Sequence, residues 1–161
     1  MKKIKLVFIL ILLMIGWIGL VHSKQVETVT KTENTTLEPQ TKMVLYFPNC
    51  NTGEFVKEYR YVSLNEVKDN VAETILKELL KGPNDQGLRQ AIPQGTKLNH
   101  VTIEGSKAVV DFSKQFIEKE ETEITRLPKI YSVVNSLTEL KEIQEVEITI
   151  EGTPYATKQR I

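Results

Sequence analysis

The imidazole and thiol side chains of this sequence, which can act as a base, a nucleophile or a metal ligand, are His22, His100 and Cys50. A metal site or an acid–base site needs several such groups that converge, and two histidines far apart in the sequence do not indicate one. Cys50 is the single cysteine, so it cannot form an internal disulfide, and no base or helix start is evident beside it. We therefore predict an inert thiol, no catalytic residue, no metal ligand and no bound cofactor.

Other polar and aromatic groups have both a functional and a structural interpretation. The acidic run at residues 118–123 has the charge to bind a cation, but its spacing lacks the order of a calcium loop, which favours a solvated loop. Tyr59 and Tyr61 share one face of a predicted strand and form either a ligand platform or, as we favour, cross-strand packing. Asn135 is predicted to hydrogen-bond a loop backbone and not a ligand.

The composition indicates one domain without a dominant charge. Among 161 residues, 21 Lys and Arg balance 21 Asp and Glu, and 40% of the residues are hydrophobic. This hydrophobic content is sufficient for one core plus appendages. Because positive charge is not in excess, we predict no binding to nucleic acid.

The N-terminus has the pattern of a membrane-directed segment. Three lysines among the first five residues precede an apolar run at residues 6–21. Positive charge before such a run keeps the N-terminus in the cytoplasm, so we predict an extracytoplasmic domain. Residues 1–23 form either an anchor in the cell membrane, which we favour, or a signal peptide cleaved after Ser23, which gives a secreted protein.

The remaining boundaries follow from local composition. Residues 24–42 are rich in Thr and Glu and poor in apolar side chains, so they are predicted to be a flexible linker. Residues 43–152 carry the apolar patterns of one folded domain. Residues 153–161 are polar and are predicted to be a C-terminal tail.

The most regular pattern is a β-hairpin at residues 96–113. Gly105 and Ser106 form its turn, because glycine supplies the positive φ that a two-residue turn needs. This register pairs Ile103 with Ala108, Val101 with Val110, and Asn99 with Phe112. The hairpin then has one covered face that includes Ile103 and one wet face that includes Thr102.

Two more strands and two helices complete the predicted domain. The runs at residues 43–47 and 55–63 flank a turn-rich loop and are predicted to pair. The first helix begins after an N-cap at Asp69 or Asn70 and ends with Gly82 as its left-handed cap. The second helix covers about residues 127–140, with Pro128 in its first turn.

The closing strand, residues 145–151, alternates apolar and acidic side chains. A helical crossover is predicted to bring it beside the first hairpin strand, which then lies in the middle of the sheet. The result is an α+β fold in the order β-β-α-β-β-α-β, with a small, mainly antiparallel sheet and both helices on one face. Glu145, Glu147 and Glu151 would line a free edge, where they resist self-pairing and favour a basic partner.

Several short motifs occur in an order and at separations typical of a known domain family. They are LYF at 45–47, LLKGP at 79–83, IPQGTKL at 92–98, AVVDFS at 108–113, YSVVNSLTEL at 131–140 and EVEITIEG at 145–152. With them the chain resembles the GerMN domain, the family of the spore germination protein GerM, in a single-domain form. The resemblance covers residues 43–152 and implies an extracytoplasmic, non-enzymatic module with a ring-building type of fold.

Two function classes follow from these observations. The first is a membrane-tethered structural or assembly module of sporulation or spore germination. Its partners would be the cell membrane, through the N-terminal segment, and an envelope or sporulation-complex protein or a second copy of the chain. The alternative is a cell-wall glycan-binding module or an accessory subunit of a peptidoglycan hydrolase. A hydrolase itself needs a nucleophile–base pair, a metal set or two facing carboxylates, and the sequence indicates none of them.

Overall fold

The predicted hairpin is formed by β3 (Leu98–Glu104) and β4 (Lys107–Phe112), in a computed structural model that describes residues 39–67 and 70–159. Gly105 occupies the turn with a φ of 63°, a conformation that glycine adopts without strain. The two strands pair antiparallel. The turn chemistry predicted from the sequence is therefore confirmed.

The hairpin register is correct near the turn and wrong near its open end. Ile103 faces Ala108 as predicted, but the register shifts at Asn99, so that Leu98 and not Asn99 faces Phe112. Asn99 leaves the ladder, and its side-chain amide donates a hydrogen bond to Asp111. A bulge of this kind re-aims one side chain, and here it is stabilised by a buried carboxylate.

Two strands earlier in the chain form a separate antiparallel pair, β1 (Gln40–Pro48) with β2 (Phe55–Ser63), which we call the ribbon. Their pairing was predicted, but β1 begins at Gln40, inside the segment 24–42 that was assigned to the linker. The folded part therefore starts three residues before the predicted boundary at residue 43. Met43, Leu45 and Phe47 are buried, because alternate residues of β1 face the core.

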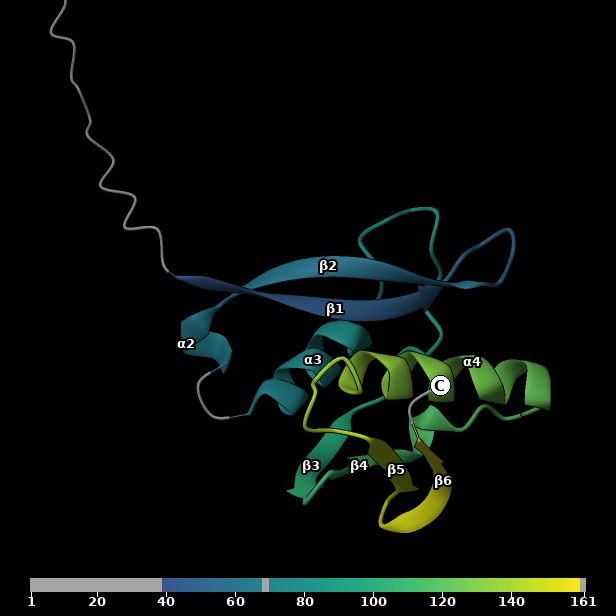
Figure 1. The fold of residues 1–161 in the computed structure, drawn as a ribbon. Coiled ribbons are helices and arrows are strands. Elements are labelled where there is room, and N and C mark those ends of the chain that lie inside the picture. Colours follow the sequence, from purple (N-terminus) through teal and green to yellow (C-terminus); the bar gives the residue numbers. More distant parts are fainter. Residues whose placement is uncertain (1–38, 68–69, 160–161) are drawn as a thin grey trace, which may run out of the picture. The chain divides into compact units, whose positions relative to one another are not determined.

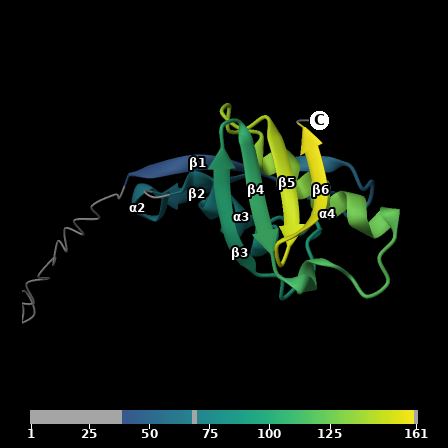
Figure 2. The ribbon, with the colours of Figure 1, turned by 90° about the horizontal axis from the view of Figure 1, so that it is seen from below.

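The main sheet has four strands in the order β3-β4-β5-β6 (Figure 2). β5 (Glu145–Ile150) pairs parallel with β4, so β4 and not β3 lies beside it, and the predicted strand order was wrong. β6 (Thr153–Gln159) pairs antiparallel with β5, so the predicted tail at residues 153–161 contains a strand. Every inward side chain of β4 is fully buried, as expected of an interior strand.

The first long helix, α3, spans Val71–Leu80. Asn70 is its N-cap: the side-chain oxygen accepts a hydrogen bond from the amide of Glu73 at 3.1 Å. Gly82 follows the helix with a φ of 82°, as its place in the sequence predicts.

The second long helix, α4, spans Glu123–Leu137, so it begins four residues before the predicted start at residue 127. Thr122 and Thr125 form a reciprocal capping box, which sequence analysis did not identify because position N3 carries Thr in place of Glu or Gln. Pro128 consequently lies in the second turn and not in the first. The acidic run at residues 118–123 ends inside this helix.

The elements form three layers (Figure 1). The middle layer consists of α3 and α4, which contact β1 on one side and β3, β5 and β6 on the other. Two short elements, α2 (Leu64–Val67) and η1 (Lys114–Phe116), complete the fold. The α+β class and the helices on one face of the sheet are confirmed, with β6 added to the predicted order. The ring-building type remains a prediction.

The core lies on both faces of the helical layer. Val101, Val110, Val134 and Ile148 are among its buried residues, but Ile103, predicted to be covered, is 44% exposed. Ile103 lies at the turn end of β3, beside the start of α3, where its side chain stays partly in contact with solvent. A charge there would remain in contact with water, so the severe destabilisation expected of a buried charge applies to Val101 and not to Ile103.

The predicted membrane segment at residues 1–23 lies outside the described residues. Within residues 39–67 and 70–159, no helix is long and apolar enough to cross a membrane.

Candidate functional site

The two histidines and the cysteine are not shown to come together. His100 lies exposed on β3, with its Nδ1 3.9 Å from Oδ2 of Asp111, and Cys50 lies exposed in the loop after β1, near the carbonyl oxygen of Gln86. His22 is outside the described residues. In the part of the chain that the structure describes, no group of three or more His, Cys, Asp or Glu is arranged to hold a metal ion.

Asp111 is buried in β4, where it accepts three hydrogen bonds. Its Oδ1 lies 2.6 Å from Oγ1 of Thr149 and 2.8 Å from the amide of Gly152, and its Oδ2 lies 2.7 Å from Nδ2 of Asn99. Burial acts to raise the pKa of this carboxyl, but these hydrogen bonds outweigh it, and the pKa lies below its ordinary value. Asp111 therefore ties the β3 bulge to the β5–β6 turn and is not available to orient His100 as a base.

Arg60, on β2, is the buried centre of an ionic cluster that sequence analysis missed. Its guanidinium lies 2.7 Å from Oε1 of Glu58 and 3.1 Å from Oε2 of Glu78, and it also donates to the backbone carbonyls of Glu78 and Gly82. The other oxygen of Glu58 accepts from two backbone amides of the loop after α3. The cluster fastens β2 to the end of α3 and to the turn at Gly82.

The prediction of a solvated acidic loop at residues 118–123 is wrong for Glu121. Glu121 pairs with Nζ of Lys129, which is fully buried in α4 and lies 2.8 Å from the carbonyl oxygen of Phe116. The same ammonium lies 5.8 Å from the centre of the Tyr155 ring. Burial and the neighbouring carboxylate raise the pKa of Tyr155. One buried cation thus joins the acidic loop, η1, α4 and β6.

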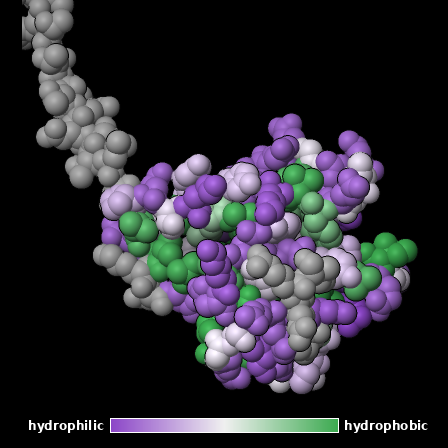
Figure 3. Space-filling view, viewed as in Figure 1, coloured by the Kyte–Doolittle hydropathy of each residue, from purple (hydrophilic) through white to green (hydrophobic). Residues whose placement is uncertain are grey.

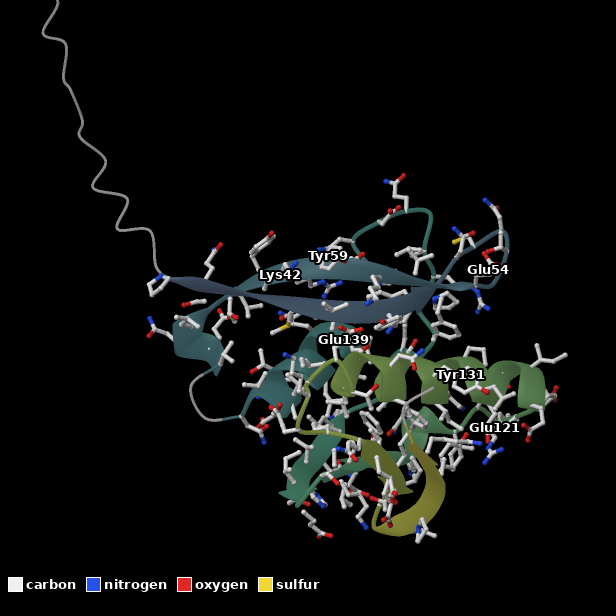
Figure 4. The ribbon with its side chains drawn as sticks, viewed as in Figure 1. Lys42, Glu54, Tyr59, Glu121, Tyr131 and Glu139 are labelled. Carbon is white, nitrogen blue, oxygen red and sulfur yellow. The ribbon has the colours of Figure 1, made fainter. Side chains whose placement is uncertain are left out.

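Tyr59 and Tyr61 are exposed on the ribbon, opposite Val44 and Lys42 of β1. The ammonium of Lys42 lies 4.5 Å from the centre of the Tyr59 ring, and Figure 4 shows these two side chains next to each other. The favoured interpretation, packing between strands, thus fits the contact of Lys42 with Tyr59. Both rings still present apolar surface to solvent, which suits a protein or glycan contact.

The acidic residues of β5 do not line a sheet edge, because β4 and β6 flank that strand. Glu147 is half-buried and pairs with Lys107 at 2.8 Å, so its charge is neutralised within the sheet. The free edges of the sheet belong to β3 and β6. Asn135, predicted to bond a loop backbone, has an Oδ1 without a hydrogen-bond partner among the described residues.

The sequence contains a weak indication that Arg60 and Lys129 are buried. Arg60 is two residues from Val62 in a strand, so both side chains share the covered face. Lys129 directly precedes Ile130 on a helix whose surroundings are apolar, and its carboxylate partner is eight residues earlier. A cation at a covered position predicts a carboxylate partner nearby, but the sequence does not identify which Asp or Glu that partner is.

Comparison with known proteins identifies the family. The Germane domain family, described by the words "Sporulation and spore germination", matches residues 44–156. The tandem GerMN domains of the sporulation protein GerM from Bacillus subtilis are 25% identical, with a TM-score of 0.61 over 73% of this chain and 41% of that chain. The first GerMN domain of the same protein is 26% identical, with a TM-score of 0.59 over 71% of this chain and 86% of that chain.

No curated protein matches the sequence. The chain spans less than half of the tandem structure and most of the single domain, so it corresponds to one GerMN unit. The family match extends from β1 to β6 and includes the whole helical layer. This chain therefore belongs to the Germane, or GerMN, domain family, which is linked to sporulation and spore germination.

Proposed function

We propose that this protein is a non-enzymatic assembly module of the sporulation or spore germination machinery, tethered to the cell membrane outside the cytoplasm. The observation that carries the proposal is the family match over residues 44–156, together with the likeness to GerMN domains of a sporulation protein. A module of this kind acts through contacts, and its partners are an envelope or sporulation-complex protein, or a second copy of the chain.

The geometry of the described residues supports contact more than turnover. The buried carboxylates Asp111, Glu58 and Glu78 are each engaged by donors within the fold, so they stabilise the structure. Exposed tyrosines lie instead on the ribbon, where a partner has access to them. Exposed aromatic side chains are enriched where proteins bind one another.

The membrane tether rests on the N-terminal sequence. Lys2, Lys3 and Lys5 precede the apolar residues 6–21, which favours a cytoplasmic N-terminus and export of the residues after the apolar run. The folded part is then held near the outer face of the membrane by the anchor, or is secreted if the chain is cleaved after Ser23.

We expect protease added to intact protoplasts to digest the folded part of the chain, because it lies outside the membrane. A cytoplasmic protein in the same sample should stay intact and serves as the control. Protection of the whole chain until the protoplasts are lysed would contradict the proposed location. N-terminal sequencing of the mature protein then distinguishes an intact anchor from cleavage after Ser23.

We expect the purified chain to release neither soluble sugar nor peptide from purified cell wall, with a known wall hydrolase as the positive control. We also expect it to be recovered from membranes of sporulating cells together with other envelope proteins. Release of wall fragments above buffer would overturn the non-enzymatic role, and recovery of the chain alone after cross-linking would overturn the assembly role.

A further inference from the structure

An apolar groove lies beside the start of the ribbon. It has a volume of about 350 Å³ and is bordered by β1, α2, α3 and the residues that follow α4. Its aliphatic lining consists of Met43, Val44, Leu64, Val67, Val71, Ile75 and Leu140. Figure 3 shows hydrophobic surface at this end of the molecule. Concave apolar surface of this size is typical of a binding site.

One wall of the groove is an open strand edge. The amide of Tyr46 donates to Oγ of Ser136 at 3.0 Å, and the carbonyl of Pro48 accepts from the amide of Arg89 at 2.9 Å, so these residues of β1 point away from β2. Because strand residues alternate, Lys42 and Val44 present their N–H and C=O groups to the same side. Within the described residues, these four groups have no hydrogen-bond partner, and both residues line the groove.

The four unpaired groups on the strand edge determine what kind of backbone the ligand has. Only an extended polypeptide matches donors and acceptors that repeat every second residue. Directly opposed residues of paired strands share a face of the sheet. Met43 is buried, so the ligand residue opposite Met43 points to the apolar side, where an aliphatic side chain fits the groove.

The charge at the groove defines a second ligand position. Lys42 is exposed and forms no ion pair with any described residue. Glu139 is the carboxylate of the lining, and it is already engaged by the hydroxyl of Tyr46 and the ammonium of Lys57. The positive charge of Lys42 thus favours an acidic residue opposite it. A second copy of β1 would bring two Lys42 side chains close together, which disfavours self-pairing.

We infer that the β1 edge and this groove bind an extended segment of a partner protein, in which an aliphatic residue is followed directly by an acidic one. In an antiparallel segment, the residue opposite Met43 comes directly before the residue opposite Lys42. The aliphatic residue therefore precedes the acidic one. The inference rests on the proposed function only for which protein supplies the segment. Binding of the segment itself depends on the groove and the β1 edge.

The test uses the full-length chain and the fluorescein-labelled peptide Ser-Thr-Leu-Glu-Thr, with capped ends, in a fluorescence polarisation titration. We expect saturable binding that the variant Val71→Glu weakens about tenfold or more, since it places a carboxylate in the apolar groove that receives the leucine of the peptide. Val71 is the first residue of α3, where an acidic side chain is favourable, so the variant should fold, as circular dichroism would verify.

Val56→Glu is the matched control, because Val56 is 40% exposed and Val71 is 39% exposed, but Val56 lies on β2 outside the groove. It should bind the peptide as the unmodified chain does. N-methylation of the peptide at its glutamate removes an amide that would bond β1 and should abolish binding. N-methylation at its leucine alters an amide that points away from β1 and should have little effect.

No saturable binding, equal binding by Val71→Glu, or equal loss from the two N-methylated peptides would each overturn the groove as a peptide site. A comparison of the two assays on the unmodified chain separates this inference from the proposed function. If the unmodified chain fails to bind the peptide but still recovers envelope proteins from sporulating cells, the groove is wrong and the assembly role stands.

Discussion

Replacing Arg60 by alanine is expected to lower the free energy of unfolding by about 3–5 kcal/mol, the range for breaking a buried ion pair from one side. The guanidinium of Arg60 is only 6% exposed, and its removal leaves the carboxylates of Glu58 and Glu78 without their main partner. Two backbone carbonyls, of Glu78 and Gly82, also lose a donor. A buried polar group without a partner lowers the free energy of unfolding by more than its hydrogen bond contributes when the bond is made.

The measurement is urea denaturation followed by circular dichroism, with Lys77→Ala as the control. Lys77 pairs with Glu73 at 2.7 Å on the exposed face of the same helix that Arg60 fastens. Because that pair is solvated, its loss should cost about 0–1 kcal/mol. Equal midpoints for the two variants would show that the Arg60 cluster does not hold β2 to α3.

Replacing Asp111 by alanine is expected to cost about 2–4 kcal/mol, because three donors lose their acceptor in a buried site. The same contacts make this loss depend on pH. The pKa of Asp111 lies below its ordinary value of about 3.9, so the ionised carboxylate stabilises the fold above that value. The contribution is lost as the pH falls through about 3.9 towards the lower pKa of the folded protein.

The pH dependence is measured with Asp111→Asn, which keeps the shape of the side chain but does not titrate. Its deficit in unfolding free energy relative to the unmodified chain should be largest near pH 7 and shrink below about pH 4. Glu104→Gln is the control, since Glu104 is exposed at the hairpin turn and its loss should be small throughout. A deficit for Asp111→Asn that stays constant from pH 7 to pH 3 would contradict this role of the carboxylate.

The sequence predicted features that depend on neighbouring residues. Gly105 fixed the hairpin turn through its positive φ, and Asn70 identified the start of α3 through its side-chain oxygen. Alternation in β5 correctly predicted Val146, Ile148 and Ile150 as buried. In each case the physical signal lies within a few residues, so one segment is enough to interpret it.

Features that depend on distant segments were not predicted. Both β3 and β4 show alternation that suits a neighbouring strand, so the pattern did not decide that β5 pairs with β4. β6 was taken for a tail because residues 153–161 are mostly polar, and its pairing with β5, which includes a register shift, is evident only in the folded chain. The partners of Arg60 at Glu78 and Gly82 are 18 and 22 residues away, so only the folded chain identifies them.

The groove was not predicted for a related reason. Its walls come from β1, α2, α3 and the residues after α4, and no single one of these segments indicates a groove in the sequence. The open edge at Lys42 and Val44 becomes evident only when β1 proves to have a partner on one side. The sequence did predict that Tyr59 and Tyr61 share one face of β2, because alternation alone determines it, but it did not predict that both rings are exposed.

The position of β1 has a mechanical consequence. Any pulling force carried by the residues before Gln40 enters the fold at the first residue of β1, whose nine residues are paired with β2 along their whole length. The same strand contributes Met43, Leu45 and Phe47 to the core and is fixed to α4 through Tyr46. A load on the N-terminal side therefore acts on a strand that is part of the core, and it reaches Met43, the first buried residue, three residues beyond Gln40.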